Sequence, residues 1–267
     1  MRVLFIGDVV GVSGQTAIKQ FLPLIKQYYR PQLTIANGEN IADGRGITEK
    51  LYKWLLAQGV DCVTLGNHAW DNREIHQFIA SATCLVRPLN LPSKTVGKGV
   101  HYIRINQSEV AIVNVLGNVF MGASQDVFQV LDVQLEGIRK RTPLILVDVH
   151  AEATSEKQAI AHFLDGRVSA VLGTHTHVQT ADARILPKGT AYVTDVGMTG
   201  AMDGIIGFRK EDVIQRFVTQ MPTRLEQKIS DDVALSGAVV DLDCKTGRAL
   251  KITSLYITRQ TVAQLSK

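Results

Sequence analysis

Short apolar runs rich in β-branched residues alternate along the chain with longer stretches whose apolar positions recur every three or four residues. The first run, residues 2–6, predicts a buried strand, and the stretch over about residues 15–29 predicts a helix with one apolar face. Pro23 lies inside that stretch. Because proline lacks a backbone N–H and crowds the preceding turn, we expect the helix to kink or break there.

The same alternation continues to the C-terminus. Further strands are expected over residues 33–36, 60–65, 100–105, 110–116, 144–149, 168–172 and 191–194, and further helices over about 48–58, 73–80, 126–141, 155–164 and 210–217. A final hairpin pairs residues 238–242 with residues 249–257. This order indicates an α/β layered fold, parallel at first and antiparallel later. No linker or repeat divides the chain, so residues 1–267 are expected to form a single domain.

Five of the predicted strands are followed by side chains that are able to bind metal. These are Asp8, Glu39 with Asn40, Asn67 with His68, His150, and His175 with His177. Because ligands bind outside the carboxyl ends of strands in open α/β sheets, we expect all five ends to face one rim of the sheet. If the last strand continues through His175 and His177, their imidazoles share one face and can bind neighbouring ions.

Each strand end also has an ordinary structural explanation. Asp8 is in a position typical of a turn or a helix cap, and the segments around Glu39 and Asn67 contain the Asn and Gly residues that favour turns. His150 directly follows a buried run and is compatible with a hydrogen-bonded core histidine. The recurrence of such residues at five strand ends favours the functional interpretation over five separate coincidences.

The residue types narrow the choice of metal. Carboxylate, amide oxygen and imidazole without thiolate suit Mn, Fe, Zn or Ni. There are more candidate ligands than one ion needs, and two ions bridged by a carboxylate would use them well. Glu39 is the natural bridge, because its two oxygens can each bind one ion.

In combination, these segments resemble the motif set of the calcineurin-like metallophosphoesterases, and most closely their bacterial YmdB-like branch. The matching pieces are Gly7-Asp8, Gly38-Glu39-Asn40, Gly66-Asn67-His68, His150 and Gly173-Thr174-His175-Thr176-His177, which extend over almost the whole chain. Two features depart from the general superfamily. Asp8 lacks the histidine of an Asp-x-His motif, and Glu39 with Asn40 stands where Gly-Asp is usual. Both departures are typical of the YmdB-like branch, in which Asn40 would replace the missing histidine.

The resemblance implies a fold, a pair of metal sites and an activity. The fold would be an α/β two-sheet metallophosphoesterase-type sandwich flanked by helices. One ion would be held by Asp8, Glu39, Asn40 and His177, and the other by Glu39, Asn67, His150 and His175. The cofactors would be two divalent or trivalent transition-metal ions, with Fe or Mn preferred and Zn compatible. The activity would be hydrolysis of small phosphodiesters, such as 2′,3′-cyclic nucleotides including 2′,3′-cAMP, by a metal-bridging hydroxide.

Three residues near these motifs carry further hypotheses. His68 belongs to neither ligand set, and we assign it as the catalytic residue that stabilises charge or protonates the leaving group. Its alternative role is to orient Asn67. Arg45 is either a phosphate ligand or part of a solvated loop, and Asp195 either hydrogen-bonds a metal-ligating imidazole or belongs to a plain turn.

Composition limits the partners and the compartment. The formal net charge of +4 comes from scattered Lys and Arg, and the chain shows no basic stretch with aromatic platforms, which argues against long nucleic acid as a partner. No apolar run approaches the roughly 20 residues of a membrane span. Three cysteines without a C-x-x-C pair argue against internal disulfides and favour the cytoplasm. Cys62, inside an apolar run, is expected to be buried.

Other functions stay open at this point, because a set of oxygen and nitrogen ligands does not name the bond that is cleaved. A metal-dependent nuclease, a phosphomonoesterase and a dinuclear hydrolase acting on amides are enzyme alternatives. A regulatory binding protein with structural metals ranks last, because structural sites are usually single and closed, often with thiolates. The sequence is also compatible with a homo-oligomer.

Overall fold

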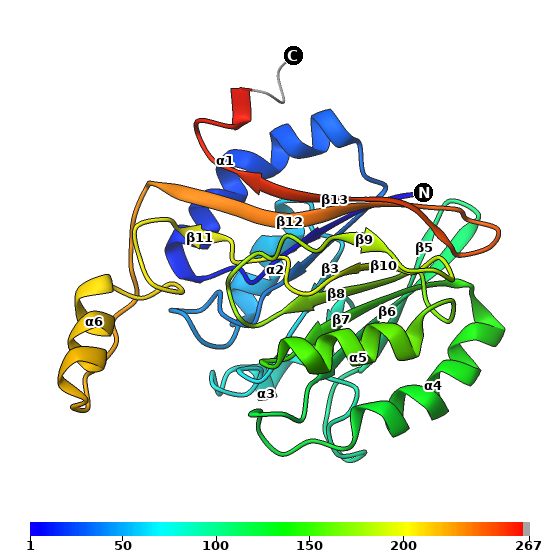
Figure 1. Cartoon of the computed structure of the whole chain (residues 1–267), viewed down its shortest axis with the longest axis horizontal. Coiled ribbons are helices and arrows are strands. Elements are labelled where there is room, and N and C mark those ends of the chain that lie inside the picture. The colour runs from blue at the N-terminus through cyan, green and yellow to red at the C-terminus, as the bar shows by residue number, and fades with distance from the viewer. Residues whose placement is uncertain (264–267) are drawn as a thin grey trace.

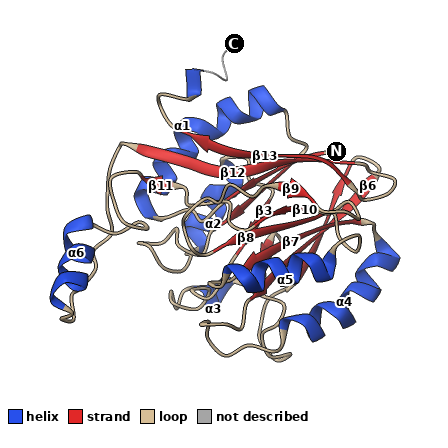
Figure 2. Cartoon of the chain, viewed as in Figure 1, coloured by secondary structure: helices blue, strands red, loops and turns tan. Residues whose placement is uncertain are grey.

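The computed structural model describes residues 1–263, in which two β-sheets pack face to face with helices on both outer sides (Figure 1, Figure 2). This arrangement confirms the expected α/β sandwich flanked by helices. The layers follow from the apolar pattern, since a strand buried on both faces alternates its side chains between two cores. On β1 (Arg2–Ile6), Val3 and Phe5 face the second sheet, whereas Leu4 and Ile6 face the helices.

The first sheet has the order β11-β12-β1-β2-β3-β4, with β13 paired to β12. Its other strands are β2 (Leu33–Asn37), β3 (Cys62–Thr64), β4 (Leu85–Val86), β11 (Gly200–Ala201), β12 (Val233–Leu242) and β13 (Ala249–Ile257). β1 to β4 are parallel, and β12 is antiparallel to β1, β11 and β13. The early strands are therefore parallel and the C-terminal hairpin antiparallel, as the order of elements predicted.

The second sheet has the order β5-β6-β7-β8-β10-β9. Its strands are β5 (Val100–Ile105), β6 (Ser108–Leu116), β7 (Leu144–His150), β8 (Ala170–Thr174), β9 (Arg184–Ile185) and β10 (Ala191–Val193). The central strands β6, β7, β8 and β10 are parallel, and both edge strands are antiparallel to their neighbours. The carboxyl ends of β7 and β8 therefore lie at the same end of this sheet.

All the described α-helices except the last pack against the body formed by the two sheets. The helices are α1 (Gly11–Tyr29), α2 (Glu49–Ala57), α3 (Ile75–Phe78), α4 (Val127–Arg141), α5 (Thr154–Leu164) and α6 (Lys210–Thr219). α1 and α2 pack on the first sheet, and α4 and α5 pack on the second. α6 projects from the body in Figure 1, and Val213 is its only buried residue. None of the helices in residues 1–263 is long and apolar enough to cross a membrane.

Several local expectations were wrong. α1 runs from Gly11 to Tyr29 without a break at Pro23, because Pro23 lies on the exposed face and water can bind the carbonyl that the missing N–H leaves free; a kink there stays a prediction. α3 is shorter than expected, and β12 begins at Val233 rather than at residue 238. β4, β9 and β11 were not predicted, because two-residue strands have too few positions to show a period. That residues 1–267 form a single domain stays a prediction.

Candidate active site

The predicted site residues meet where the two sheets end, not along one sheet. β1, β2 and β3 lead to Asp8, Glu39 with Asn40, and Asn67 with His68, whereas β7 and β8 lead to His150, His175 and His177. The expectation of a single rim was therefore wrong. Because the sheets face each other with their parallel strands ending at the same end of the molecule, two rims converge there (Figure 1).

His150 lies at the centre of the cluster and is completely buried. Its Nε2 atom is 2.9 Å from Glu39 Oε1, 2.9 Å from Asn67 Oδ1 and 3.1 Å from His175 Nδ1. Among the described residues, Glu39, His150 and His175 offer ligand atoms that all lie within 4.8 Å of one another. Four groups with lone pairs thus converge, and this is the arrangement that a divalent metal ion requires.

Asp8 and Asn40 each bury an oxygen without a hydrogen-bond partner. Asp8 Oδ2 accepts the backbone N–H of His175 at 3.1 Å, and its Oδ1 has none. The Asn40 amide donates to Gly44 O at 2.9 Å, which fixes the amide and leaves Oδ1 unpaired. An unsatisfied buried acceptor costs about 1–3 kcal/mol. Two such oxygens beside the cluster fit the donor set that a cation would complete.

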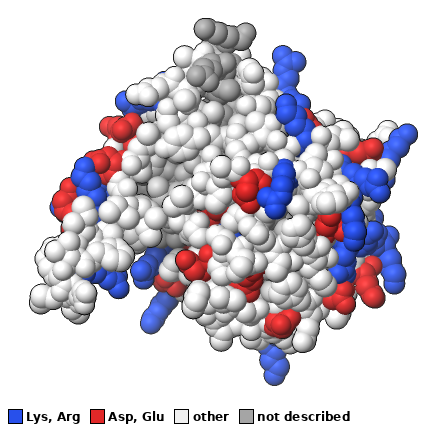
Figure 3. Space-filling model, in the orientation of Figure 1, with Lys and Arg blue, Asp and Glu red and all other residues white. Residues whose placement is uncertain are grey.

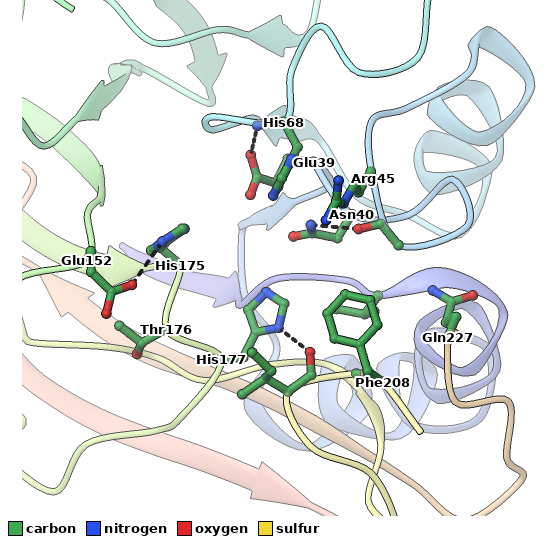
Figure 4. A pocket seen from close by; sticks show the side chains of 14 residues that line it. Glu39, Asn40, Arg45, His68, Glu152, His175, Thr176, His177, Phe208 and Gln227 are labelled. Atoms are coloured by element: carbon green, nitrogen blue, oxygen red, sulfur yellow. Dashed lines mark hydrogen bonds and ion pairs between the residues drawn. The ribbon is translucent and has the colours of Figure 1, made fainter. Parts of the chain in front are cut away.

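His175 and His177 are presented by a turn. β8 ends at Thr174, and both histidines have positive φ, 100° and 63°. The strand therefore does not continue through the two histidines, and the condition under which they would share its face is not met. His177 Nδ1 lies 3.0 Å from Ile206 O, so the ring donates there and its Nε2 is left with a lone pair. His175 Nε2 lies 3.1 Å from Glu152 Oε2 (Figure 4). Its Nδ1 lies 3.1 Å from His150 Nε2.

Burial governs the charge of the cluster. It raises the pKa of Glu39 to about 7 and shifts the pKa of Asp8 in the same direction. Burial lowers the pKa of His150 to about 4, and it lowers the pKa values of His175 and His177 as well. Near neutral pH the imidazoles are therefore uncharged, which is the form that binds metal.

His68 lies beside the cluster and is held from two sides. Its backbone N–H donates to Glu39 Oε2 at 2.9 Å, and its Nδ1 is 2.8 Å from Asp71 Oδ2. The side chain is 25% exposed and lines a pocket of about 250 Å3. Asp71 was not identified from the sequence. Its position three residues after His68 was the only signal available.

The pocket lies against the cluster and has two kinds of wall. Figure 4 shows Asn40 and Arg45 on one side and His177 and Phe208 on the other. Phe208 comes from the segment between β11 and β12, which the sequence did not mark as functional. Arg45 lines the pocket and is also exposed to solvent, so both of its alternatives stay predictions. The cavity therefore combines a cation, an aromatic ring and the metal-binding cluster.

Asp195 holds the turn that carries His175 and His177 through hydrogen bonds to Thr176. It is completely buried and forms a 2.7 Å ion pair with Lys157, which is also completely buried. The same oxygen accepts the backbone N–H of Thr176 at 3.1 Å and its hydroxyl at 2.8 Å. The hypothesis that Asp195 hydrogen-bonds a ligating imidazole was therefore wrong, because its side chain accepts from Lys157, Thr176 and the backbone of Gly197.

The family model described as YmdB-like protein matches residues 4–255. The chain belongs to the YmdB-like family. A 2′,3′-cyclic-nucleotide 2′-phosphodiesterase of Bacillus subtilis strain 168 is 51% identical to it over 257 residues, which are 96% of this chain and 97% of the relative.

Two solved structures extend the comparison. A hypothetical protein of Thermus thermophilus is 44% identical with a TM-score of 0.90, and the match covers 97% of this chain and 99% of that one. A protein of Mycoplasma pneumoniae described as a novel phosphatase is 34% identical with a TM-score of 0.91, over 97% and 93% of the two chains. The resemblance to the YmdB-like family seen in the motifs is thus confirmed.

The buried ion pair under the histidine turn generates a stability prediction. Lys157→Met leaves the charge of Asp195 buried without its partner, and we expect the free energy of unfolding to fall by about 3–5 kcal/mol. Urea denaturation followed by circular dichroism measures this loss. The matched control is Lys53→Met, which breaks an exposed pair with Glu49 and should cost at most about 1 kcal/mol. Equal effects of the two substitutions would show that the buried pair does not stabilise the fold.

Proposed function

We propose that this YmdB-like protein is a dinuclear metal-dependent phosphodiesterase that hydrolyses small phosphodiesters, with 2′,3′-cyclic nucleotides such as 2′,3′-cAMP as its substrate class. The observation that carries the proposal is the convergence of buried Glu39 and His150 with the half-buried His175. Glu39 and His175 also line the pocket. The name of the Bacillus subtilis relative, a 2′,3′-cyclic-nucleotide 2′-phosphodiesterase, supports the substrate class.

The proposal assigns two metal ions to the two ligand sets that the family resemblance implied. One ion is assigned to Asp8, Glu39, Asn40 and His177, and the other to Glu39, Asn67, His150 and His175. The unpaired oxygens of Asp8 and Asn40 and the lone pair on His177 Nε2 support the first set. Fe or Mn is the proposed metal, with Zn also compatible, because the set contains no thiolate. When bound, the two ions would polarise the phosphoryl oxygens and lower the pKa of bound water.

The protein's own residues supply positioning and a proton. A ribose oxygen is a poor leaving group unless it is protonated as the bond to phosphorus breaks. Asp71 accepts the Nδ1 proton of His68, so delivery of a proton to the leaving oxygen is assigned to Nε2 of the doubly protonated imidazolium, which becomes the neutral Nδ1–H ring. Arg45 is assigned to the negative charge of the phosphate. Phe208 supplies an apolar wall for the rest of the substrate.

The scope of the proposal follows from the size and charge of the molecule. A pocket of about 250 Å3 suits a small diester better than a long nucleic acid. On the face drawn in Figure 3, basic side chains lie among acidic ones and form no continuous basic groove. We propose a cytoplasmic enzyme, because all three cysteines are free and Cys62 is buried as expected. Both sheets contribute to one site, which supports a single domain.

Turnover of 2′,3′-cAMP by metal-reconstituted protein tests the proposal directly. We expect conversion to a nucleoside monophosphate, measured by liquid chromatography, and we expect a chelator to abolish it and added Mn2+ to restore it. Glu39→Gln should lose metal and activity together, because it removes the proposed bridging carboxylate. If protein with both ions bound fails to hydrolyse the cyclic nucleotide, the substrate class is wrong.

Metal binding should release protons in a manner that depends on pH. Because the pKa of Glu39 is about 7 in the metal-free site, this carboxyl holds a proton at about pH 6 and has lost it at about pH 8. We therefore expect affinity for Mn2+ to rise with pH through neutrality, with more protons released at the lower pH. Calorimetry in buffers of different ionisation enthalpy measures the release. Identical proton release at both pH values would contradict a buried carboxylate ligand.

The catalytic assignment of His68 predicts a loss of rate without a loss of metal. His68→Ala should slow turnover by about 100-fold or more while two ions remain bound, because it removes the proton donor and no ligand. Asp71→Asn, which keeps His68 but weakens its orientation, should give a smaller loss. Metal analysis beside steady-state kinetics separates the two roles of His68. Loss of metal together with activity would indicate that His68 only supports Asn67.

A further inference from the structure

A hydroxyl lies between a buried carboxylate and the central imidazole of the site. Thr174 Oγ1 donates to Asp148 Oδ1 at 2.7 Å and lies 2.8 Å from His150 Nδ1. Asp148 and His150 are two residues apart on β7 and so lie on one face, and Thr174 is the register partner of His150 on β8. None of the three is more than 2% exposed. The β7–β8 pairing itself therefore brings these side chains together.

The orientation of Asp148 is fixed from the first sheet. Asn37 Oδ1 accepts the backbone N–H of Glu39 at 3.1 Å, so the amide nitrogen of Asn37 must point the other way. This nitrogen donates to Asp148 Oδ2 at 3.1 Å and to Leu65 O at 3.2 Å. Asp148 thus accepts one hydrogen bond on each oxygen, from Asn37 and from Thr174. The geometry thus places both oxygens of Asp148 as acceptors, although burial raises the pKa of this carboxyl to about 7.

The direction of the Thr174–Asp148 hydrogen bond favours one nitrogen of His150 as the site of its proton. A threonine hydroxyl has a single hydrogen, and Thr174 uses it on Asp148. Towards His150 it then accepts, so the series of hydrogen bonds from Asn37 through Asp148 and Thr174 favours a proton on His150 Nδ1. Nε2 then keeps its lone pair and faces Glu39 and the other proposed ligands. Asn67 Oδ1 and Glu39 Oε1 compete for a ring proton at Nε2 in the metal-free site, and an ion bound at Nε2 would remove that competition.

We propose that Thr174 and Asp148 are positioning residues that hold His150 as the Nδ1–H tautomer and so prepare Nε2 to bind metal. This inference rests on the proposed function only in taking His150 as a metal ligand. Metal-ligating histidines commonly donate their second N–H to a carboxylate or carbonyl, and loss of such a partner typically weakens affinity by about 10–100-fold. Here a threonine hydroxyl connects the carboxylate to the ring.

The first test is the tautomer of His150 in the full-length protein. Nitrogen chemical shifts of the histidine rings, from long-range proton–nitrogen correlation, distinguish a protonated from an unprotonated ring nitrogen. We expect Nδ1 to carry the proton in both the metal-free and the Zn2+-loaded protein, with the signals assigned by their loss in His150→Gln. A proton on Nε2 in the metal-free wild-type protein overturns the proposal, whatever any variant does.

The second test uses a matched pair of substitutions at Thr174. Thr174→Val keeps the shape but removes the acceptor at Nδ1, so the remaining acceptors for a ring proton are those at Nε2. We expect the His150 proton to move to Nε2 and Zn2+ affinity, measured against a chromophoric chelator, to fall about 10–100-fold. Thr174→Ser keeps the hydroxyl and should retain the wild-type tautomer and affinity. Circular dichroism verifies that each variant is folded.

The outcomes separate this inference from the proposed function. Wild-type tautomer and Zn2+ affinity in Thr174→Val would overturn the positioning role, as would equal losses in the valine and serine variants. Neither readout requires catalysis. If the protein binds two ions through a correctly protonated His150 but hydrolyses no phosphodiester, the proposed function fails and the inference about Thr174 and Asp148 stands.

Discussion

The rest of the structure depends on two carboxylates buried together without a basic partner. Asp8 and Glu39 are at most 1% exposed, and among the described ion pairs neither is matched with Lys or Arg. Burial of an unpaired charge is costly, so such groups take up protons or bind metal. Burial disfavours the charged form of both an acid and a base, so it raises the pKa of Glu39 and lowers the pKa of His150. The metal-free site therefore presents ligand atoms from side chains that burial keeps uncharged, and such a site is suited to binding cations.

The burial of apolar side chains in the layers of the fold offsets the free-energy cost of these buried carboxyl groups. Three buried clusters, one between the sheets and one under each helical layer, hold the strands rigidly while their polar ends meet. Rigidity matters because ligand atoms must stay within a few tenths of an ångström of their positions. The buried pair of Lys157 and Asp195 extends the support to the turn that carries His175 and His177, where the backbone has left the strand.

A second layer of polar groups links the two sheets beneath the proposed ligands. Asn37 belongs to β2 and Asp148 to β7, and their contact joins the backbone of Glu39 to the ring of His150. The YmdB-like site is thus one hydrogen-bonded unit rather than a set of independent side chains. Above it, Arg45 and Phe208 come from loops, which are free to vary with the substrate while the unit below keeps its geometry.

The sequence by itself determined which residues stand at the strand ends, because a residue's place relative to its own strand is a local property. Asp8, Glu39, Asn67, His150 and His175 were all identified in this way. Only the tertiary structure decided that these ends meet on two facing sheets, that His175 and His177 lie in a turn, and that Asp195 pairs with Lys157. Asn37 and Asp148 are 111 residues apart along the chain. No local pattern encodes such a contact, because it arises only when the packing of the two apolar layers sets the position of one sheet against the other.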